Sequence, residues 1–418
     1  SCTNLFFKLK LKQMRKMRNE QINSSNYTRT IQFLYRHPRA TRTEIYQGTA
    51  MTPATVSQTV TALIADNLVI ETGIEVAKTK GSGRKQKVIS LNPTYGYLMG
   101  VDFTLAGLAI VITNVTGEIQ AQDVLTYDQI ANQSINDTII NAVQTMLAAY
   151  QNLNILALGI SIPGHYDLER HTIISNNPMW NAFNLETIRQ KIDLPVIAEN
   201  NVESMALARY LFDAEATPEK FLFLQVGFGL YCSFIEPNSL HPKQNYYIGE
   251  IGHTVVNPHG TQCECGKRGC LQTFISETWL VKRAKQLFVL SDTSVIHSLV
   301  KNLDEIDLRT VLAAYELGDP YMTDILDQGI EYLGISVANL LMMCDADAIY
   351  INSRILQRED FKQRVTQTIS NQLKFIPTKK NTTVQILPYQ SVRGAQGACA
   401  LAAFANIIKN ESYQKISL

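Results

Sequence analysis

The chain has 418 residues, of which 45% are hydrophobic and 18% charged, with a formal net charge of +1 at pH 7. This composition is typical of a folded protein of two or three domains. No run of 18 apolar residues occurs, which excludes a transmembrane helix and predicts no membrane insertion. Four of the seven cysteines are scattered and no export signal is apparent, so we expect a cytoplasmic protein.

Charge is distributed unevenly along the chain. Residues 1–90 contain 15 Lys or Arg and 5 Asp or Glu, whereas the remainder contains 23 Lys or Arg and 32 Asp or Glu. A basic N-terminal module joined to an acidic body is typical of a polyanion-binding head on a sensor or an enzyme. Much of the basic excess lies in residues 8–18, so a solvated basic tail is the alternative.

The N-terminal periodicity predicts short helices. A first helical stretch ends at His37-Pro38, and Thr41 with Glu44 then forms a capping-box pattern that opens a short helix. Thr52 before Pro53 predicts the start of another helix, with Thr52 as its N-cap. The expected buried stripe of that second helix consists of Val56, Val60, Leu63 and Ile64.

The opposite face of this second helix has small or amide side chains that can approach base edges in a major groove. Its predicted DNA-contacting residues are Thr52, Ala54, Thr55, Ser57, Gln58 and Thr61. Two strand-like runs follow, and the basic loop between them resembles a wing, with Arg84 and Lys85 at its tip placed to contact DNA. We therefore expect a winged helix-turn-helix that binds double-stranded DNA. A three-helix packing module with a solvated loop is the alternative.

The body shows two successive series of elements. The first series has strands at 98–104, 108–113, 119–125 and 155–162, with a helix at 135–150. The second has strands at 221–226 and 230–235, with helices at 280–287, 308–317 and 322–344. This order predicts an α/β fold with a sheet of mixed direction and two lobes, with a ligand cleft between them. The helix at 322–344 has more apolar residues than one face needs, so we expect it to form part of a dimer interface.

A cluster of metal-ligand residues lies in the second series. His253 precedes Cys263, Cys265 and Cys270, and three thiolates with one imidazole make a full tetrahedral zinc set. The alternatives are a disulfide knuckle, which is disfavoured without an export signal, and free thiols. With four protein ligands no coordination position stays open. We therefore expect one structural zinc per chain.

The same stretch closely resembles the signature of the ROK family of repressors and sugar kinases. The resemblance rests on Gly249-Glu250-Ile251-Gly252-His253 and on the cysteine motif up to Gln272. Further matching stretches lie in chain order at Ile160–Gly164, Asn177–Trp180, Glu199–Asn201 and Gly394–Ala398. The N-terminal module resembles the repressor branch, such as xylose and N-acetylglucosamine repressors.

The resemblance implies an α/β fold: a winged helix-turn-helix followed by a two-lobed actin-like, or ribonuclease-H-like, body. The implied DNA-binding domain comprises residues 1–92. The first lobe would comprise 93–205, completed by a C-terminal helix at about 394–412. The second lobe, with the metal loop and the dimer interface, would comprise 206–393.

The phosphate-transfer positions depart from the family pattern. Asn201 occupies the position of the family's catalytic Asp, and an amide cannot act as a base. The phosphate-loop glycines are lost in Asp102–Leu105 and in part in Gly227–Tyr231, and Asn352-Ser353 replaces a Gly-Gly pair. Loss of a general base alone typically costs about 10² to 10⁴ in rate. We therefore expect no catalytic residue and no kinase activity.

The sugar-binding positions implied by the resemblance are better kept. They are Asn200, Asn201, Glu250, His253 and Gln272. Glu250 has two acceptor oxygens, which suit a pair of vicinal hydroxyls. Gln272 stands where kinases often have Glu, and Asn201 can bind a hydroxyl without deprotonating it. Trp180 could stack on a sugar or close the core, and the sequence does not decide between them.

Together these features predict a sugar-responsive repressor of carbohydrate-utilisation genes, such as those of xylose metabolism. A homodimer, or a tetramer, would bind a palindromic operator. A monosaccharide effector would shift the balance of lobe arrangements by its differential affinity for them. The alternatives are an ATP-dependent sugar kinase with an appended DNA-binding domain, and a repressor controlled by a transport-protein partner.

Overall fold

A computed structural model describes residues 25–76, 86–167, 172–174, 178–236, 245–377 and 382–409. The chain divides into two compact units. The first unit comprises Ser1–Ile174, Met179–Thr217 and Val392–Leu418, and the second comprises Ser175–Pro178 and Pro218–Ser391. Apart from the short segment Ser175–Pro178, the chain therefore leaves the first unit at Pro218, forms the second unit up to Ser391, and returns at Val392 to complete the first.

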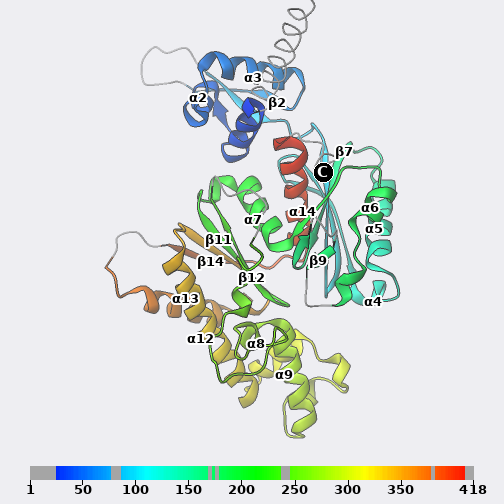
Figure 1. Ribbon diagram of the computed structural model, residues 1–418, viewed down its shortest axis with the longest axis vertical. Helices are drawn as coiled ribbons and strands as arrows, with labels where there is room; N and C mark the ends of the chain where they lie inside the picture. Colours follow the sequence, from blue (N-terminus) through cyan, green and yellow to red (C-terminus); the bar gives the residue numbers. More distant parts are fainter. Residues whose placement is uncertain are drawn as a thin grey trace, which may run out of the picture. The chain divides into compact units, whose positions relative to one another are not determined.

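The N-terminal module belongs to the first unit. Its elements are a helix at 25–36, β1 (Ala40–Thr41), α2 (Arg42–Thr49), α3 (Pro53–Ala65), β2 (Val69–Val76) and β3 (Gln86–Leu91). The three strands form an antiparallel sheet in the order β1-β3-β2. Figure 1 shows α2 and α3 in blue beside β2. The two helices and the two longer strands are those predicted from the sequence.

Side-chain caps define where these helices begin. The Thr41 hydroxyl accepts from the Glu44 backbone N–H, and the Glu44 carboxylate accepts from the Thr41 N–H at 2.7 Å, so the predicted capping box is confirmed. Thr52 caps α3 by accepting from the Thr55 N–H, and Pro53 is its first residue. In the predicted stripe of α3, Val56, Val60 and Leu63 are buried and Ile64 is half-buried.

The rest of the first unit is an α/β lobe. Its strands are β4 (Tyr97–Thr104), β5 (Gly107–Asn114), β6 (Ile119–Thr126), β7 (Ile155–Ile162), β8 (His165–Asp167), β9 (Thr172–Ile174) and β10 (Val196–Asn200). Its helices are α4 (Tyr127–Ile130), α5 (Ile135–Ala149), η1 (Pro178–Ala182), α6 (Leu185–Lys191), α7 (Asn201–Phe212), η2 (Ala214–Ala216), α14 (Arg393–Ala403) and η6 (Phe404–Ile408). The main sheet has the order β10-β7-β4-β5-β6.

This sheet has mixed direction, as predicted. Strand β7 is parallel to β4 and to β10, and β5 is antiparallel to β4 and to β6. In Figure 1, α5 and α6 cover one face of the sheet, and α14 and α7 lie on the other. The lobe core includes Val101, Ile110, Leu158 and Ile160, all of which are buried. Such uninterrupted apolar strands are typical of a sheet that is covered on both faces.

Helix α14 lies directly on the sheet because two strand glycines leave room for its backbone. A Cβ atom at Gly100 would lie 2.0 Å from the carbonyl oxygen of Ala395, and one at Gly159 would lie 1.9 Å from that of Ala398. Helix α7 packs as a whole in this unit and continues to Phe212. The first unit therefore extends to Thr217, later in the chain than the predicted lobe boundary at residue 205.

The second unit has its own sheet and core. Its strands are β11 (Phe221–Val226), β12 (Leu230–Ile235), β13 (Ala348–Ser353) and β14 (Thr383–Leu387), in the order β12-β11-β13-β14. Its helices are η3 (Ile251–His253), α8 (Gln272–Ile275), α9 (Glu277–Leu290), α10 (Ile296–Leu299), η4 (Leu303–Glu305), α11 (Leu308–Glu316), α12 (Pro320–Met343), η5 (Ile355–Gln357) and α13 (Glu359–Leu373). Strand β13 is parallel to both of its neighbours.

Helix α12 is the helix for which we expected a dimer interface. Its apolar residues Ile325, Ile330 and Leu333 are buried within the core of the second unit. Helix α13 covers α12, so a Cβ atom at Gly334 would lie 2.7 Å from the Thr368 side chain. These three residues therefore pack within the chain, whereas Met342 and Met343 at the end of α12 are 48% and 85% exposed, and the dimer contact stays a prediction.

Candidate metal centre and effector site

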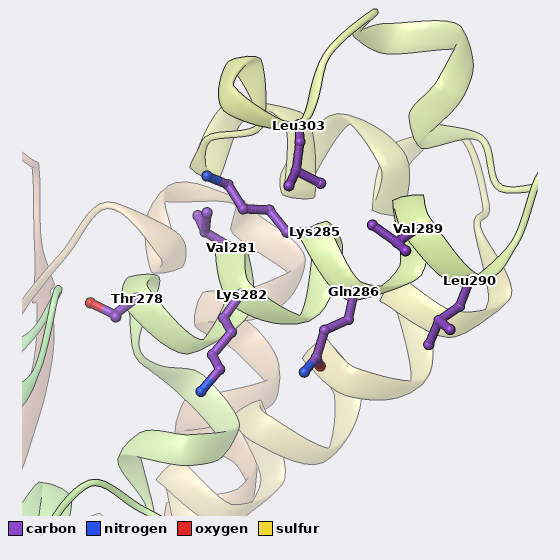
Figure 2. A pocket seen from close by; sticks show the side chains of 8 residues that line it. All are labelled: Thr278, Val281, Lys282, Lys285, Gln286, Val289, Leu290 and Leu303. Carbon is purple, nitrogen blue, oxygen red and sulfur yellow. The ribbon is translucent and has the colours of Figure 1, made fainter.

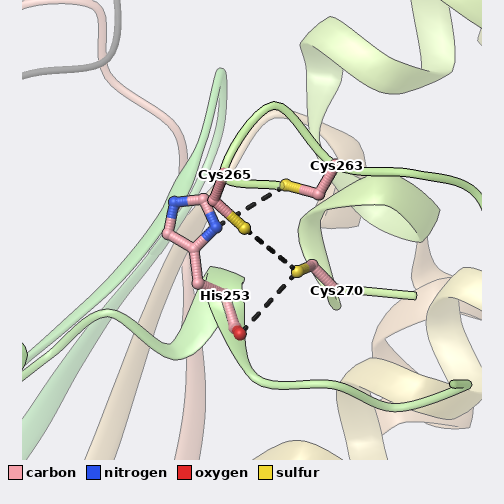
Figure 3. Close-up of side chains that lie close together, drawn as sticks. All are labelled: His253, Cys263, Cys265 and Cys270. Carbon is pink, nitrogen blue, oxygen red and sulfur yellow. Dashed lines mark hydrogen bonds between the residues drawn. The ribbon is translucent and has the colours of Figure 1, made fainter. Parts of the chain in front are cut away.

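The loop from His253 to Cys270 brings its four predicted ligand residues together. Backbone bridges pair Val255 with Cys270 and Gln262 with Arg268, which fold the loop back on itself. One ligand atom from each of His253, Cys263, Cys265 and Cys270 lies within 4.8 Å of the other three. Figure 3 shows the three sulfur atoms and the imidazole converging on one point.

Two glycines make this convergence possible. Gly266 has φ +87° and Gly269 has φ +68°, in the left-handed region that favours glycine. At Gly269 a side chain would also collide with the loop, because a Cβ atom would lie 1.5 Å from the carbonyl oxygen of Asn257. At Gly266 nothing lies within 4 Å of the Cβ position. A side chain at Gly269 is therefore disfavoured both by the backbone conformation and by lack of room. At Gly266 only the backbone conformation disfavours one.

The donor set suits a metal ion and not a disulfide. The Cys265 and Cys270 sulfurs are 3.6 Å apart, and the Cys263 sulfur lies 3.6 Å from Nδ1 of His253. A disulfide bond would need about 2.05 Å between sulfurs, and these three cysteines are free. Three thiols and one imidazole form the Cys₃His set that binds tetrahedral zinc. The cluster could therefore hold one metal ion through four protein ligands.

Surrounding polar groups support the loop. The Gln272 side-chain amide donates to the Cys263 sulfur at 3.6 Å and to the carboxylate of Glu264. The Trp279 indole N–H also donates to Glu264, at 3.2 Å. Hydrogen bonds of this kind around metal ligands orient them. Sequence reasoning assigned no role to Glu264 or Trp279; the position of Glu264 between two ligand cysteines is the one signal that could have identified it.

The predicted sugar-binding residues are divided between the two units. In the second unit, Glu250 directly precedes η3, and its carboxylate lies 4.0 Å from Nε2 of His253. Because Nδ1 of that imidazole is the atom near Cys263, Nε2 is left on the side of Glu250. Gln272 is 6% exposed, and its amide nitrogen already donates to the metal loop. Glu250 and His253 are half-buried, so their side chains are more accessible to a ligand than that of Gln272.

In the first unit, Asn200 and Asn201 lie where β10 passes into α7. The Asn200 side-chain oxygen accepts from the backbone N–H groups of Val202 and Glu203, and its amide nitrogen donates to the Gly164 carbonyl at 2.8 Å. Asn200 is thus the N-cap of α7, a role that sequence reasoning missed although Asn is a favoured N-cap residue. Asn201 is the first helical residue and is half-buried.

Buried polar side chains lie at two of the positions where the sequence departs from the family's phosphate motifs. Asp102, at the end of β4, is 8% exposed, and burial raises its pKa to about 7. One of its carboxylate oxygens has no hydrogen-bond partner. At the end of β13 the Asn352 amide donates to the Gln225 side chain at 2.7 Å. These contacts lie within the protein and do not form a donor-rich loop of the kind that holds phosphate.

An ion pair follows at the same end of β13. The Arg354 guanidinium lies 3.2 Å from the carboxylate of Glu277, the first residue of α9. The Glu277 side chain is only 5% exposed, and its burial raises its pKa to about 7, an effect that Arg354 partly opposes. Glu277 also donates its backbone N–H to the carbonyl of Gly227, in the second altered phosphate motif.

The structure also shows the surroundings of Trp180 and His259. Trp180 is 3% exposed and meets the ring of Phe103 edge-on at 5.5 Å. It therefore closes the lobe core, which resolves the choice that the sequence left open. His259 is exposed and lies outside the metal cluster.

The predicted DNA-contacting face of α3 is largely exposed. Its exposed members are Thr52, Ala54, Ser57, Gln58 and Thr61, and Thr55 is half-buried. The Thr52 and Thr55 hydroxyls lie 2.8 Å apart at the start of the helix. The other two predicted DNA contacts, Arg84 and Lys85, lie outside the described residues. Across the described part of the chain, no helix is both long and apolar enough to cross a membrane.

A surface hollow of about 600 Å³ lies along α9. Figure 2 shows its lining, which combines lysine side chains with aliphatic ones such as Val289 and Leu290. Those two residues are 68% and 84% exposed, so the hollow is shallow. It contains none of the predicted sugar-binding residues, and we assign no ligand to it.

Comparison with curated proteins finds several repressors. The xylose repressor of Caldicellulosiruptor bescii is 28% identical over 357 residues, which cover 82% of this chain and 87% of the relative. The xylose repressor of Bacillus subtilis is 22% identical over 363 residues, covering 84% of this chain and 90% of the relative. The DNA-binding transcriptional dual regulator NagC of Escherichia coli is 21% identical over 344 residues, which cover 81% of this chain and 82% of the relative.

Solved structures share the fold. A ROK family transcriptional regulator, described as a homologue of the E. coli MLC protein, matches with a TM-score of 0.72 at 20% identity and covers 94% of this chain and 98% of that one. A ROK family glucokinase from Streptomyces griseus matches with a TM-score of 0.61 at 24% identity, covering 74% of this chain and 100% of that one. These likenesses confirm the predicted fold class.

The family itself is defined by a match over most of the body. The model of the ROK family matches residues 98–404. This range includes the metal loop, the strand-to-helix junction at Asn200 and helix α14. The chain therefore belongs to the ROK family.

Proposed function

We propose that this chain is a sugar-responsive transcriptional repressor of carbohydrate-utilisation genes, acting in the cytoplasm. Its N-terminal module binds operator DNA, and a monosaccharide held by Glu250, His253, Asn200, Asn201 and Gln272 changes the operator affinity. The relatives named as repressors support this reading. The observation that carries it is the exposed polar face of α3, because small and amide side chains at the start of a recognition helix can reach base edges.

The DNA-binding part is tested by substitution on that face. A duplex selected from a random pool by the wild-type chain serves as the operator probe. Replacing Gln58, which is exposed, by alanine should weaken binding to this duplex by about 1–3 kcal/mol if the amide contacts a base. Replacing the exposed Gln120 on strand β6 is the matched control. Equal affinity of both variants for the selected duplex would contradict the assignment of α3.

The sugar-binding part is tested by a thermal-shift screen with xylose, glucose and N-acetylglucosamine. A ligand that binds only the folded chain raises its melting temperature. The Glu250→Gln variant should lose that shift while keeping the fold, because this half-buried carboxylate lies outside the hydrophobic cores. A repressor controlled by a transport-protein partner would instead show no shift with any free sugar.

We propose further that the chain is not an active kinase. Asn201 lacks a carboxylate base, and Asn352, at one of the altered phosphate motifs, is bonded to the Gln225 side chain. A coupled ATPase assay with the same sugars should show no turnover. Sugar-dependent turnover that disappears in the Glu250→Gln variant would instead favour the sugar kinase with an appended DNA-binding domain.

We propose that the Cys₃His cluster holds one structural zinc per chain. Its geometry supports this, because four protein ligands leave no coordination position for chemistry. The metal would fix Cys270 and His253, and hence the adjoining Glu250 and Gln272. Metal analysis of the purified chain should give one zinc per chain.

We propose that the repressor is a homodimer, or a tetramer, on a palindromic operator. A winged helix that reads a half-site needs a second copy to read the other. The apolar residues in the middle of α12 are buried within the chain, which leaves the exposed Met342 and Met343 at its end as the apolar part of this helix available to a second copy. Light scattering of the free protein and of its complex with the selected duplex measures the copy number.

A further inference from the structure

The first helix of the module, at 25–36, makes a specific contact with helix α7. Arg36 donates one guanidinium N–H to the backbone carbonyl of Tyr210 at 2.8 Å and another to that of Thr217 at 2.8 Å. The guanidinium also lies 4.4 Å from the centre of the Tyr210 ring. Carbonyls in the last turn of a helix lack partners within the helix, and a cation is favoured there. Arg36 therefore caps the C-terminal end of α7.

Neighbouring contacts hold the same junction. The buried Tyr35 hydroxyl donates to the backbone carbonyl of Val115 at 2.8 Å, and its ring lies 6.4 Å from that of Phe212, the last residue of α7. Phe212 in turn packs on Gly117, where a Cβ atom would lie 2.2 Å from the phenyl ring. The module is thus attached to the end of α7 and to the turn that follows β5.

The other end of α7 is the Asn200–Asn201 junction. Strand β10 ends at Asn200 and α7 begins at Asn201, so no loop separates strand from helix. The Asn200 side chain accepts from the first turn of α7 and donates to the Gly164 carbonyl after β7. A displacement of Asn200 or Asn201 therefore acts directly on the helix, because no loop residues lie between them.

Helix α7 is continuous and tightly packed along its length. Eight of its residues are buried, and α14 approaches it so closely that a Cβ atom at Gly397 would lie 2.8 Å from the Met205 backbone nitrogen. Its 12 residues span about 18 Å at about 1.5 Å per residue. A rigid helix with one end at predicted ligand contacts and the other at the DNA-binding module can couple the two.

We infer that α7 transmits the sugar signal to the DNA-binding module, with Arg36 as the positioning residue that joins them. This inference rests on the proposed function, since Asn200 and Asn201 are taken as sugar contacts. Sugar binding at the start of α7 shifts the helix, and Arg36 transfers that shift to the first helix of the module. The orientation of the module, and with it operator affinity, then differs between the two states.

The test compares operator affinity with and without sugar in full-length variants. The probe DNA is the duplex selected by the wild type, and the sugars are xylose, glucose and N-acetylglucosamine. In the wild type the effective sugar should change operator affinity by about 5- to 150-fold, the range typical of coupled sites. In Arg36→Gln, sugar binding measured by calorimetry should be retained, and the sugar should leave operator affinity almost unchanged.

Two further variants make the result specific. Arg29→Gln removes the same charge from an exposed position on the same helix, so it should lose DNA affinity only through general electrostatics and keep the sugar response. Tyr35→Phe removes only the hydroxyl that reaches Val115 and should reduce the response, which provides a test if Arg36→Gln is unfolded. A full response in Arg36→Gln and Tyr35→Phe would overturn the inference. A wild type whose operator affinity no sugar changes would overturn the proposed function, and would leave α7 no signal to transmit.

Discussion

The metal loop and the altered phosphate motifs use buried polar groups in opposite ways. In the loop, His253 and three cysteines make only long contacts with one another, near 3.6 Å, so the site remains competent for an external ion. At the phosphate-motif positions, Asn352 pairs with Gln225 and Arg354 pairs with Glu277. The loop therefore keeps bonding capacity for an external ion, whereas Asn352 and Arg354 are bonded to side chains of the same chain.

The largest expected effect comes from breaking the metal loop. Cys263→Ser removes a thiolate ligand, and binding of structural zinc is worth about 10–16 kcal/mol in small peptides. Even a fraction of that free energy should lower the melting temperature and abolish the sugar response together. Cys344→Ser, at a half-buried cysteine outside the cluster, is the control. Metal loss with a normal sugar response would separate the loop from the effector site.

The second test concerns the two loop glycines. Gly269→Ala should greatly reduce zinc content and stability, because its Cβ atom would collide with the Asn257 carbonyl. Gly266→Ala meets no atom and should cost only about 1–2 kcal/mol for its left-handed backbone. Chemical denaturation and metal analysis of both variants measure the difference. Equal losses in the two would show that space at Gly269 does not limit the fold.

The third test concerns Asp102, which lies at a phosphate-motif position and has a carboxylate oxygen without a hydrogen-bond partner. Burial raises the pKa of Asp102 to about 7, above the ordinary value of 3.8. The folded chain therefore binds this proton more tightly than the unfolded chain, and the resulting stability is present below pH 4 and is lost as pH rises through 7. Asp102→Asn cannot ionise, so its stability relative to the wild type should rise by about 1.4 kcal/mol for each pH unit between those two pKa values.

Denaturation at pH 4, 6 and 8 measures this effect. The unfolding free energy of Asp102→Asn minus that of the wild type should be lowest at pH 4 and highest at pH 8. Asp123→Asn, at an exposed position on β6, should show no such trend. A difference that stays constant with pH would mean that Asp102 is not buried in the free chain.

The smallest expected effect comes from the internal ion pair. Arg354→Ala leaves the Glu277 carboxylate buried without its cation, and breaking a fully buried pair costs about 3–5 kcal/mol. The cost should be lower here because 32% of the Arg354 side chain is exposed. Double substitution with Glu277→Gln should recover part of the loss, as measured by chemical denaturation. Independent, additive losses would contradict a pairing role.

Much of the fold could be predicted from local sequence signals. The Thr41–Glu44 capping box, the Thr52 cap before Pro53 and the long apolar strands specify elements through neighbouring residues, so sequence order is enough to find them. The metal ligands could be predicted for the same reason, since thiols at short spacing within one loop have few other uses. The ROK resemblance then predicted the two-lobed body.

The remaining features depend on contacts between distant residues. Helix α13 packs on α12, a contact that no local pattern indicates. The cap made by Asn200 involves the carbonyl of Gly164, and the amide of Gln272 is held by Glu264. In each case the side-chain type was noticed, but its partner is set by the tertiary fold. Sequence reasoning therefore identified these side chains as candidates and missed the contacts that hold them.

The return of α14 to the first unit has a consequence for synthesis. Strands β4 and β7 leave a face that α14 covers, through the close approaches at Gly100 and Gly159. That helix begins at Arg393, after Ser391, the last residue of the second unit, so a nascent chain lacks it until the second unit has been made. The lobe that carries the DNA-binding module therefore completes its core last, and a prematurely terminated chain would be left with an unfinished lobe.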